Sequence, residues 1–108
     1  MKNFEELIEE HGQWADETFP MGTSVGALLH AEREIKEIIE DIESGKPLEV
    51  KAKEYADAMF CLMDSARREG VAVSDILRAG DEKLQINKAR KWKYNGDGSY
   101  SHIKTPTH

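Results

Sequence analysis

The chain has 108 residues, the length of one typical domain, so a monomer would have only a modest hydrophobic core. Its 21 acidic and 15 basic residues give a formal net charge of -6, which excludes the general attraction of a basic protein to nucleic acid or anionic membranes. Cys61 is the single cysteine, so no intramolecular disulfide can form, and the sequence lacks an apolar run of the roughly 18–20 residues that span a membrane. We therefore expect one soluble, intracellular domain over residues 1–108.

Helical periodicity dominates the sequence, and the first two of four expected helices have clear starts. Asn3 and Glu6 are spaced as a capping box for a helix over about 3–17. Thr23 or Ser24 can cap a second helix that runs to about residue 43. The segment Ser44-Gly45-Lys46-Pro47 then combines a glycine stop with a proline start, which is typical of a tight link between helices.

The second half of the chain predicts two further helices and a tail. The third helix is expected over about 47–69, with Gly70 at its end. Ser74 can cap the fourth, which runs to about residue 91 and contains Gly80, where a helix can bend or break. Residues 93–108 are interpreted as a polar tail with turn signals at Asn95-Gly96 and Asp97-Gly98.

Apolar residues recur at helical spacing along the second and third helices, and the short link makes these helices antiparallel neighbours. The stripes consist of Leu28, Ala31, Ile35, Ile38, Ile39 and Ile42, and of Tyr55, Ala58, Met59, Leu62 and Ala66. We interpret them as core and expect an all-α four-helix bundle with this antiparallel pair at its centre. Because the core is thin for the chain length, we also expect helices to pack across subunits of a homo-oligomer.

Acidic residues border both apolar stripes on the same rotational side, at about 100° per residue. In an antiparallel pair this places four of them where they can converge: Glu34, Glu37, Glu54 and Asp57. Four converging carboxylates repel one another unless a cation lies between them, and all-oxygen ligands suit Mg²⁺ or Mn²⁺. The alternative is a pair of solvated acidic stripes at the edge of two amphipathic helices.

Other chemistries lack the residues that they need. None of the 4 histidines follows a glutamate at the spacing of a di-iron bundle, and no glycine-rich phosphate loop is present. Cys61 has no base beside it in the sequence, and we interpret it as a residue at the edge of the core. The sequence therefore offers no clear covalent nucleophile.

The end of the fourth helix is basic in an otherwise acidic chain. Lys83, Asn87 and Arg90 share one helical face, from which their side chains can hold phosphate groups. The alternative is that these cations only complement the dipole at the carboxyl end of a helix.

Taken together, these segments resemble the MazG-like, all-α nucleoside triphosphate diphosphohydrolases, and in particular their short dATP/dGTP diphosphohydrolase branch, which is widespread in phages. The resemblance covers nearly the whole chain. Its motifs are Gln13-Trp14 with Thr18-Phe19, the segment from His30 through Glu34 to Glu37, Glu54 with Asp57, the set Lys83, Asn87, Arg90 and Trp92, and Ser101-His102-Ile103-Lys104. The sequence departs from the branch at Pro20-Met21-Gly22, where glycine more often follows Thr-Phe directly.

The resemblance implies hydrolysis of a purine (deoxy)nucleoside triphosphate, dGTP or dATP, to the monophosphate and pyrophosphate. It implies that Glu34, Glu37, Glu54 and Asp57 hold Mg²⁺ or Mn²⁺, which activates a water molecule. Which carboxylate orients or deprotonates that water stays open, with Glu37 and Glu34 as the candidates.

The resemblance also assigns substrate contacts. Lys83, Asn87, Arg90 and Trp92 would hold phosphates or sugar, partly across a subunit boundary of a homodimer or tetramer. Trp14 and Phe19 would stack on the base, or else pack as ordinary core residues. His30 would support Glu34 or lie at the edge of the core. The expected location is the cytoplasm of a bacterium or of a phage-infected cell.

A different class of protein, a non-enzymatic helical regulatory dimer, also has amphipathic stripes and an acidic composition. It does not explain four converging acids in a chain that also carries a basic Asn/Arg face. Neither nucleic acid nor a membrane is an expected partner.

Overall fold

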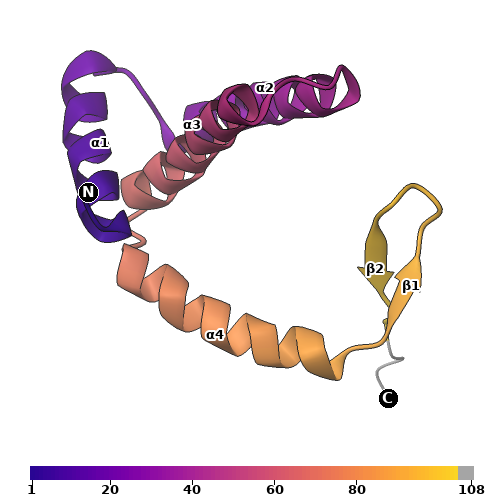
Figure 1. Ribbon diagram of the computed structural model, residues 1–108. Coiled ribbons are helices and arrows are strands. Elements are labelled where there is room, and N and C mark those ends of the chain that lie inside the picture. Colours follow the sequence, from indigo (N-terminus) through magenta and orange to yellow (C-terminus); the bar gives the residue numbers. More distant parts are fainter. Residues whose placement is uncertain (105–108) are drawn as a thin grey trace. The chain divides into compact units, whose positions relative to one another are not determined.

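The computed structural model describes residues 1–104, which form four helices followed by a short β-hairpin (Figure 1). The elements are α1 (Phe4–Thr18), α2 (Ser24–Glu43), α3 (Leu48–Arg68), α4 (Val73–Ala89), β1 (Trp92–Tyr94) and β2 (Tyr100–His102). Residues 1–73 make one compact unit and a second begins at Ser74, and each is described by itself. The four expected helices are confirmed and the described chain is mostly helical, but a short hairpin that the sequence analysis did not expect follows them. No helix in the described residues is long and apolar enough to cross a membrane.

The helix starts follow the local chemistry of the sequence. The Asn3 side chain accepts a hydrogen bond from the Glu6 backbone N–H at 2.8 Å and so caps α1. Its amide also donates to the Glu6 carboxylate at 3.0 Å, so Glu6 contacts the side chain of Asn3 and not the backbone N–H that a capping box uses. Thr23, rather than Ser24, caps α2, because its hydroxyl accepts from the Gly26 N–H at 2.9 Å. Gly45, with a φ of 70°, ends α2, and Pro47 precedes the first residue of α3.

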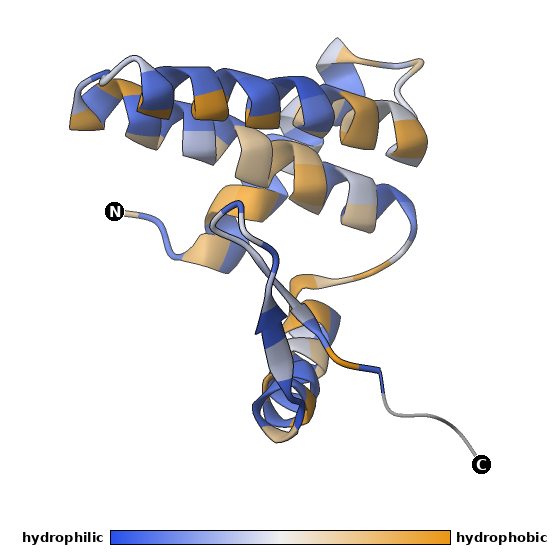
Figure 2. Ribbon diagram, turned by 90° about the vertical axis from the view of Figure 1, so that its right-hand side faces the viewer, coloured by the Kyte–Doolittle hydropathy of each residue, from blue (hydrophilic) through white to orange (hydrophobic). Residues whose placement is uncertain are grey.

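The centre of the first unit is the antiparallel pair α2 and α3, against which α1 packs through α3. Small buried residues, Ala31 on α2 and Ala58 on α3, allow the helices to approach closely. Ile8 and Ala15 of α1, Ile38 of α2 and Cys61 of α3 complete the small core. Hydrophobic positions recur along the α2–α3 pair (Figure 2), yet Ile39 and Ile42 are 50% and 52% exposed. The single chain therefore leaves part of its apolar stripe uncovered.

Helix α4 differs from the helix expected in this region at its start, at its end and at Gly80. Helix α4 begins at Val73, so Ser74 lies inside it and is not its cap, and the helix ends at Ala89 rather than near residue 91. It runs through Gly80 without interruption. None of its residues is buried.

The expected polar tail is in part a β-hairpin. Trp92 pairs with His102 and Tyr94 with Tyr100, and the Tyr94 and Tyr100 rings lie 5.2 Å apart. The predicted turn signals form the connection, where Gly96 and Gly98 adopt φ of 87° and 89°. Strands of three residues are too short to show the alternation of apolar and polar residues that predicts a strand, so the sequence does not reveal this hairpin. Residues 105–108 of that tail lie outside the described residues.

Candidate active site

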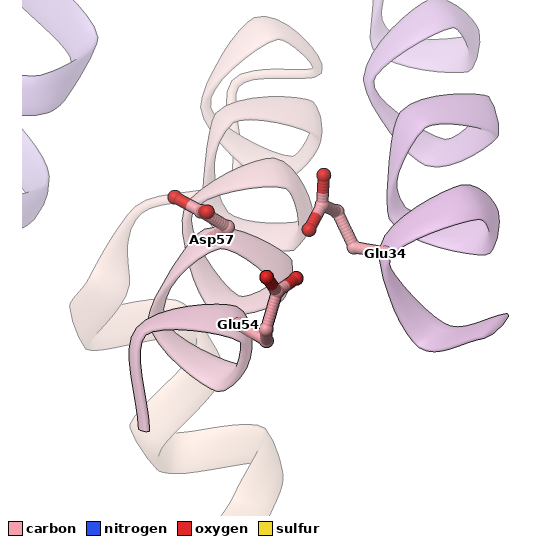
Figure 3. A group of neighbouring side chains, drawn as sticks. All are labelled: Glu34, Glu54 and Asp57. Atoms are coloured by element: carbon pink, nitrogen blue, oxygen red, sulfur yellow. The ribbon is translucent and has the colours of Figure 1, made fainter. Parts of the chain in front are cut away.

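Three carboxylates from two helices meet on one side of the α2–α3 pair. Glu54 and Asp57 lie three residues apart on α3, which places them on one face, and Glu34 projects from α2 toward them (Figure 3). One ligand atom from each of the three lies within 4.8 Å of the others. The antiparallel arrangement thus brings together side chains that are 20 or more residues apart in the sequence.

Two oxygens of this cluster lack the partners that buried polar atoms require. Glu34 and Glu54 are half-buried, and the Oε2 atom of each is inaccessible to solvent without a hydrogen-bond partner among the described residues. The other oxygen of Glu34, Oε1, lies 3.2 Å from Nε2 of His30, one turn earlier on α2. A buried oxygen without a donor is costly, and a bound cation removes that cost.

The pKa of Glu54 shows that the cluster lacks a positive charge to balance its carboxylates. The loss of solvation of Glu54, followed by its interactions with the neighbouring Glu37 and Glu34 carboxylates, raises its pKa from 4.5 to about 7. A carboxyl group that resists ionisation near neutral pH marks a place where a divalent cation fits well.

Glu37 adjoins the cluster without being one of its three central members. It is exposed and lies outside the group whose atoms fall within 4.8 Å of one another. Its carboxylate nevertheless contributes to the raised pKa of Glu54, so the two groups are close in space. Three of the four predicted acids therefore converge and the fourth borders them.

A cavity of about 600 Å³ opens beside the carboxylates, and Asp57 belongs to both. Its wall includes three further predicted substrate residues, Trp14, Phe19 and His30. The Trp14 and Phe19 rings meet edge to face, with centroids 5.2 Å apart. Both side chains are about half exposed, so the chain does not use them as fully buried core residues.

The sequence analysis missed part of this wall. The His11 imidazole stacks on the Phe60 ring with centroids 4.3 Å apart and planes 2° from parallel, and both rings line the cavity. Burial lowers the pKa of His11, which favours the neutral ring in this stack. The contact of His11 with α3 leaves no trace in the sequence, because it depends on how α1 packs.

Cys61 also lines the cavity but is unsuited to nucleophilic attack. It is buried, and burial, followed by the charges of Glu34 and Asp57, raises the pKa of its thiol. A thiol with a raised pKa stays protonated, and the thiolate is the reactive form.

The predicted basic face lies in the second unit. The Arg90 guanidinium donates to the Asn87 side-chain oxygen at 3.1 Å, and the Trp92 indole N–H donates to the Asn87 carbonyl at 3.0 Å. These three residues therefore form one connected group, with Lys83 one turn earlier on α4.

Comparison with known proteins relates the chain to one family of phage enzymes. The family described as dATP/dGTP pyrophosphohydrolase matches residues 7–108. A dATP/dGTP diphosphohydrolase of Salmonella phage PMBT28 is 34% identical over 83% of this chain and 28% of its own length, so the chain spans less than a third of that relative. The dATP/dGTP diphosphohydrolase of cyanophage S-2L is 34% identical over 91% of this chain and 86% of its own length.

The fold agrees with this relationship. A solved structure of the cyanophage S-2L MazG-like pyrophosphohydrolase, bound to dGDP and three catalytic Mn²⁺ ions per active site, matches with a TM-score of 0.75 and 28% identity. The match covers 96% of this chain and 100% of that one. The resemblance carried by the sequence motifs is confirmed, and the chain belongs to the dATP/dGTP pyrophosphohydrolase family.

Proposed function

We propose that this chain is a metal-dependent diphosphohydrolase that cleaves a purine deoxynucleoside triphosphate, dGTP or dATP, to the monophosphate and pyrophosphate. The observation that carries the proposal is the pair of unpartnered carboxylate oxygens on Glu34 and Glu54, beside an aromatic cavity that shares Asp57 with them. The substrates and the Mn²⁺ ions of the related phage proteins support the same assignment.

The carboxylates are proposed to hold Mg²⁺ or Mn²⁺. Glu34, Glu54 and Asp57 provide the converging oxygens, and Glu37 borders them. When bound, divalent ions there neutralise the triphosphate, polarise the phosphorus and lower the pKa of a bound water. Without them, a protein with a net charge of -6 repels its polyanionic substrate.

Within this site, Glu37 is the proposed base for the attacking water, with Glu34 as the second candidate. Glu37 is exposed, so its carboxylate is open to solvent water, whereas Glu34 is half-buried and contacts His30. His30 is proposed to orient Glu34. The thiol of Cys61 has a raised pKa, which leaves direct attack by water as the reaction that this site supports.

The cavity is proposed to hold the nucleoside. Its volume of about 600 Å³ lies in the usual range for small-molecule sites. Trp14 and Phe19 supply aromatic surface for stacking on a purine, and Asp57 connects this pocket to the carboxylates. A base in the cavity would place the phosphates at the carboxylates, where the proposed cleavage between the α and β phosphates takes place.

The second unit and the exposed apolar face complete the proposal. Lys83, Asn87, Arg90 and Trp92 are proposed to hold phosphates or sugar, in the same subunit or in a partner. The chain is proposed to form a homodimer or tetramer, because Leu28, Ile35, Ile39 and Ile42 of α2 all remain exposed.

Pyrophosphate release tests the function directly. The purified chain should release pyrophosphate from dGTP or dATP only when Mg²⁺ or Mn²⁺ is present, and Glu54→Gln should abolish most of that release. Glu40→Gln is the matched control, because Glu40 is an exposed acid on α2 outside the cluster. No release from any deoxynucleoside triphosphate, with folded protein and either metal, would favour the non-enzymatic regulatory dimer instead.

A further inference from the structure

A network of two arginines around one buried aspartate lies at the end of α3. Asp64 is 8% exposed, and both of its oxygens are occupied. Its Oδ1 accepts from Arg67 at 2.7 Å and 3.3 Å, and its Oδ2 accepts from Arg68 at 2.9 Å. Burial alone would raise the pKa of Asp64, but the hydrogen bonds and charges of Arg68 and Arg67 lower it, so the carboxylate stays ionised.

Each arginine then reaches a different segment of the first unit. Arg67 donates to both oxygens of Asp16 on α1, at 2.9 Å and 3.1 Å. Arg68 donates to the Gly22 carbonyl, in the loop between α1 and α2, at 2.8 Å. Asp64 thereby fixes two guanidinium groups that connect α3 to α1 and to the loop.

The two connected segments have glycines where the arginines approach. A Cβ at Gly12 would lie 2.6 Å from Cδ and Nε of Arg67, and a Cβ at Gly22 would lie 2.9 Å from the Arg68 guanidinium. The Gly12 position is buried inside α1, so no space exists there for a side chain beside Arg67. The arginines therefore pack closely against α1 and the loop in addition to binding them.

The same two segments carry the aromatic wall of the cavity. Trp14 and His11 project from α1, and Phe19 begins the loop that Arg68 holds at Gly22. Asp64 and Arg68 themselves line the cavity. The carboxylates lie elsewhere, on α2 and earlier on α3: Asp57, the nearest of those on α3 in sequence, precedes Asp64 by two helical turns, about 10 Å along the axis.

We infer that Asp64, Arg67 and Arg68 are positioning residues that preform the nucleoside side of the site and set how tightly the nucleoside binds, without serving the metal ions. The inference rests on the proposed function. Such preorganisation acts on substrate affinity, because a loose wall must be ordered each time that a nucleoside binds.

The closing experiment separates the nucleoside side of the site from the metal side. Arg68→Lys keeps the charge but cannot bind Asp64 and the Gly22 carbonyl with the same planar fork, and Asp64→Asn weakens both guanidinium contacts. We expect KM for the purine deoxynucleoside triphosphate to rise at least about tenfold while kcat changes less than about threefold. Inhibition by inorganic tripolyphosphate, which has no base, should keep its wild-type inhibition constant in both variants.

The control is Arg78→Lys. Arg78 forms a comparable ion pair with Asp75 at 2.6 Å on α4, but its side chain is 74% exposed. The Arg78→Lys variant should have the same KM for the nucleotide as the wild type. If Asp64→Asn does not fold, Arg68→Lys alone decides the question.

Two outcomes would overturn the inference, and they are distinct from a failure of the proposed function. A wild-type KM in folded Arg68→Lys would show that the network does not position the nucleoside. An equal loss of nucleotide and tripolyphosphate binding would show that the network supports the whole site rather than its base side. Absence of pyrophosphate release by the wild-type protein would instead remove the proposed function, and this inference with it.

Discussion

At the scale of single residues, the unusual feature is a set of acids that the metal-free fold does not stabilise. Glu34 and Glu54 each have one oxygen that is shielded from water and unpaired within the described residues. Such groups destabilise the folded chain unless a ligand satisfies them. This is the expected cost of building a cation site before the cation arrives.

The raised pKa of Glu54 predicts how metal-free stability depends on pH. Because the pKa of Glu54 is about 7 in the folded chain and 4.5 for an unperturbed glutamate, folding favours the protonated carboxyl group. That stabilising effect is complete below about pH 4.5 and is lost as the pH rises through about 7. In EDTA, Glu54→Gln should therefore melt at a higher temperature than the wild type at about pH 8, with the difference shrinking toward about pH 5.

Thermal melts of both proteins across this range, repeated with Mn²⁺, measure the effect. The metal should stabilise the wild type and reverse the order at about pH 8, because only the wild type keeps all of its carboxylates. Glu40→Gln supplies the control, since it alters an exposed acid outside the cluster. A metal-free Glu54→Gln that melts below the wild type at every pH would contradict the repulsion argument.

Turnover should depend on the same carboxylates. Glu34→Gln, Glu54→Gln and Asp57→Asn keep the side-chain size and remove a charged oxygen ligand, so each should reduce kcat/KM by at least about two orders of magnitude, or about 3 kcal/mol. Glu37→Gln should lower kcat to a similar degree if it is the base. Steady-state rates of pyrophosphate release measure all four, and full activity in two of them would refute the assignment of the metal site.

At the scale of elements, α4 and the hairpin connect the basic face into one group. Asn87 accepts from the Arg90 guanidinium through its side chain and from the Trp92 indole through its carbonyl. The geometry thus orients Arg90 more firmly than an attraction to the helix dipole would.

This orientation predicts a selective loss of nucleotide binding. Arg90→Ala and Asn87→Ala should weaken triphosphate binding while Mn²⁺ binding in the absence of nucleotide stays nearly unchanged. Lys88→Ala is the matched control, because Lys88 is also a basic residue in the last turn of α4 but is exposed. Calorimetric titrations with metal alone and with a nucleotide analogue separate the two effects. If Lys88→Ala weakens binding as much as Arg90→Ala, the dipole explanation of this segment is the better one.

The elements also show which features a sequence can predict. Capping at Asn3 and Thr23 and the break at Gly45 depend on neighbouring residues, so local chemistry was sufficient. The convergence of Glu34 with Glu54 and Asp57 followed from helical rotation plus one short link. The Asp16–Arg67 ion pair joins residues 51 positions apart, and the His11–Phe60 stack depends on how α1 packs, so neither has a local signal. The sequence does not predict the hairpin for a different reason: its strands are too short to show alternation of apolar and polar residues.

At the scale of the whole molecule, the net charge favours bound cations, and the exposed apolar surface favours association with a second subunit. A net charge of -6 opposes a triphosphate, which makes cations necessary for binding. Four large apolar residues of α2, namely Leu28, Ile35, Ile39 and Ile42, remain exposed, and an exposed apolar face of this kind is typical of an interface. A closed two-fold dimer is the commonest way to cover such a face.

Charge placed on this face should separate the subunits. Ile39 and Ile42 are about half exposed in the single chain, so Ile39→Asp and Ile42→Asp should each cost the fold of one subunit only about 1 kcal/mol, the loss of a half-buried isoleucine. In a dimer the same aspartates would be buried without a partner, and association should fall sharply. Sedimentation of the variants against the wild type measures this, with Glu40→Gln as a control that should not alter association.

An active site shared between two subunits can be tested by mixing two inactive variants. If Arg90 of one subunit serves the carboxylates of another, a mixture of Arg90→Ala and Glu34→Gln subunits contains heterodimers with one intact site, although each variant alone is nearly inactive. Mixing after mild dissociation should then restore activity toward about a quarter of the wild-type value, because random exchange makes half of the dimers mixed and each mixed dimer has one complete site of two. Pyrophosphate release before and after mixing measures the recovery, and Glu54→Gln mixed with Glu34→Gln is the control, since every site then keeps one of the two defects. A sedimenting monomer with full activity at nanomolar concentration would exclude both the shared site and the assembly that it requires.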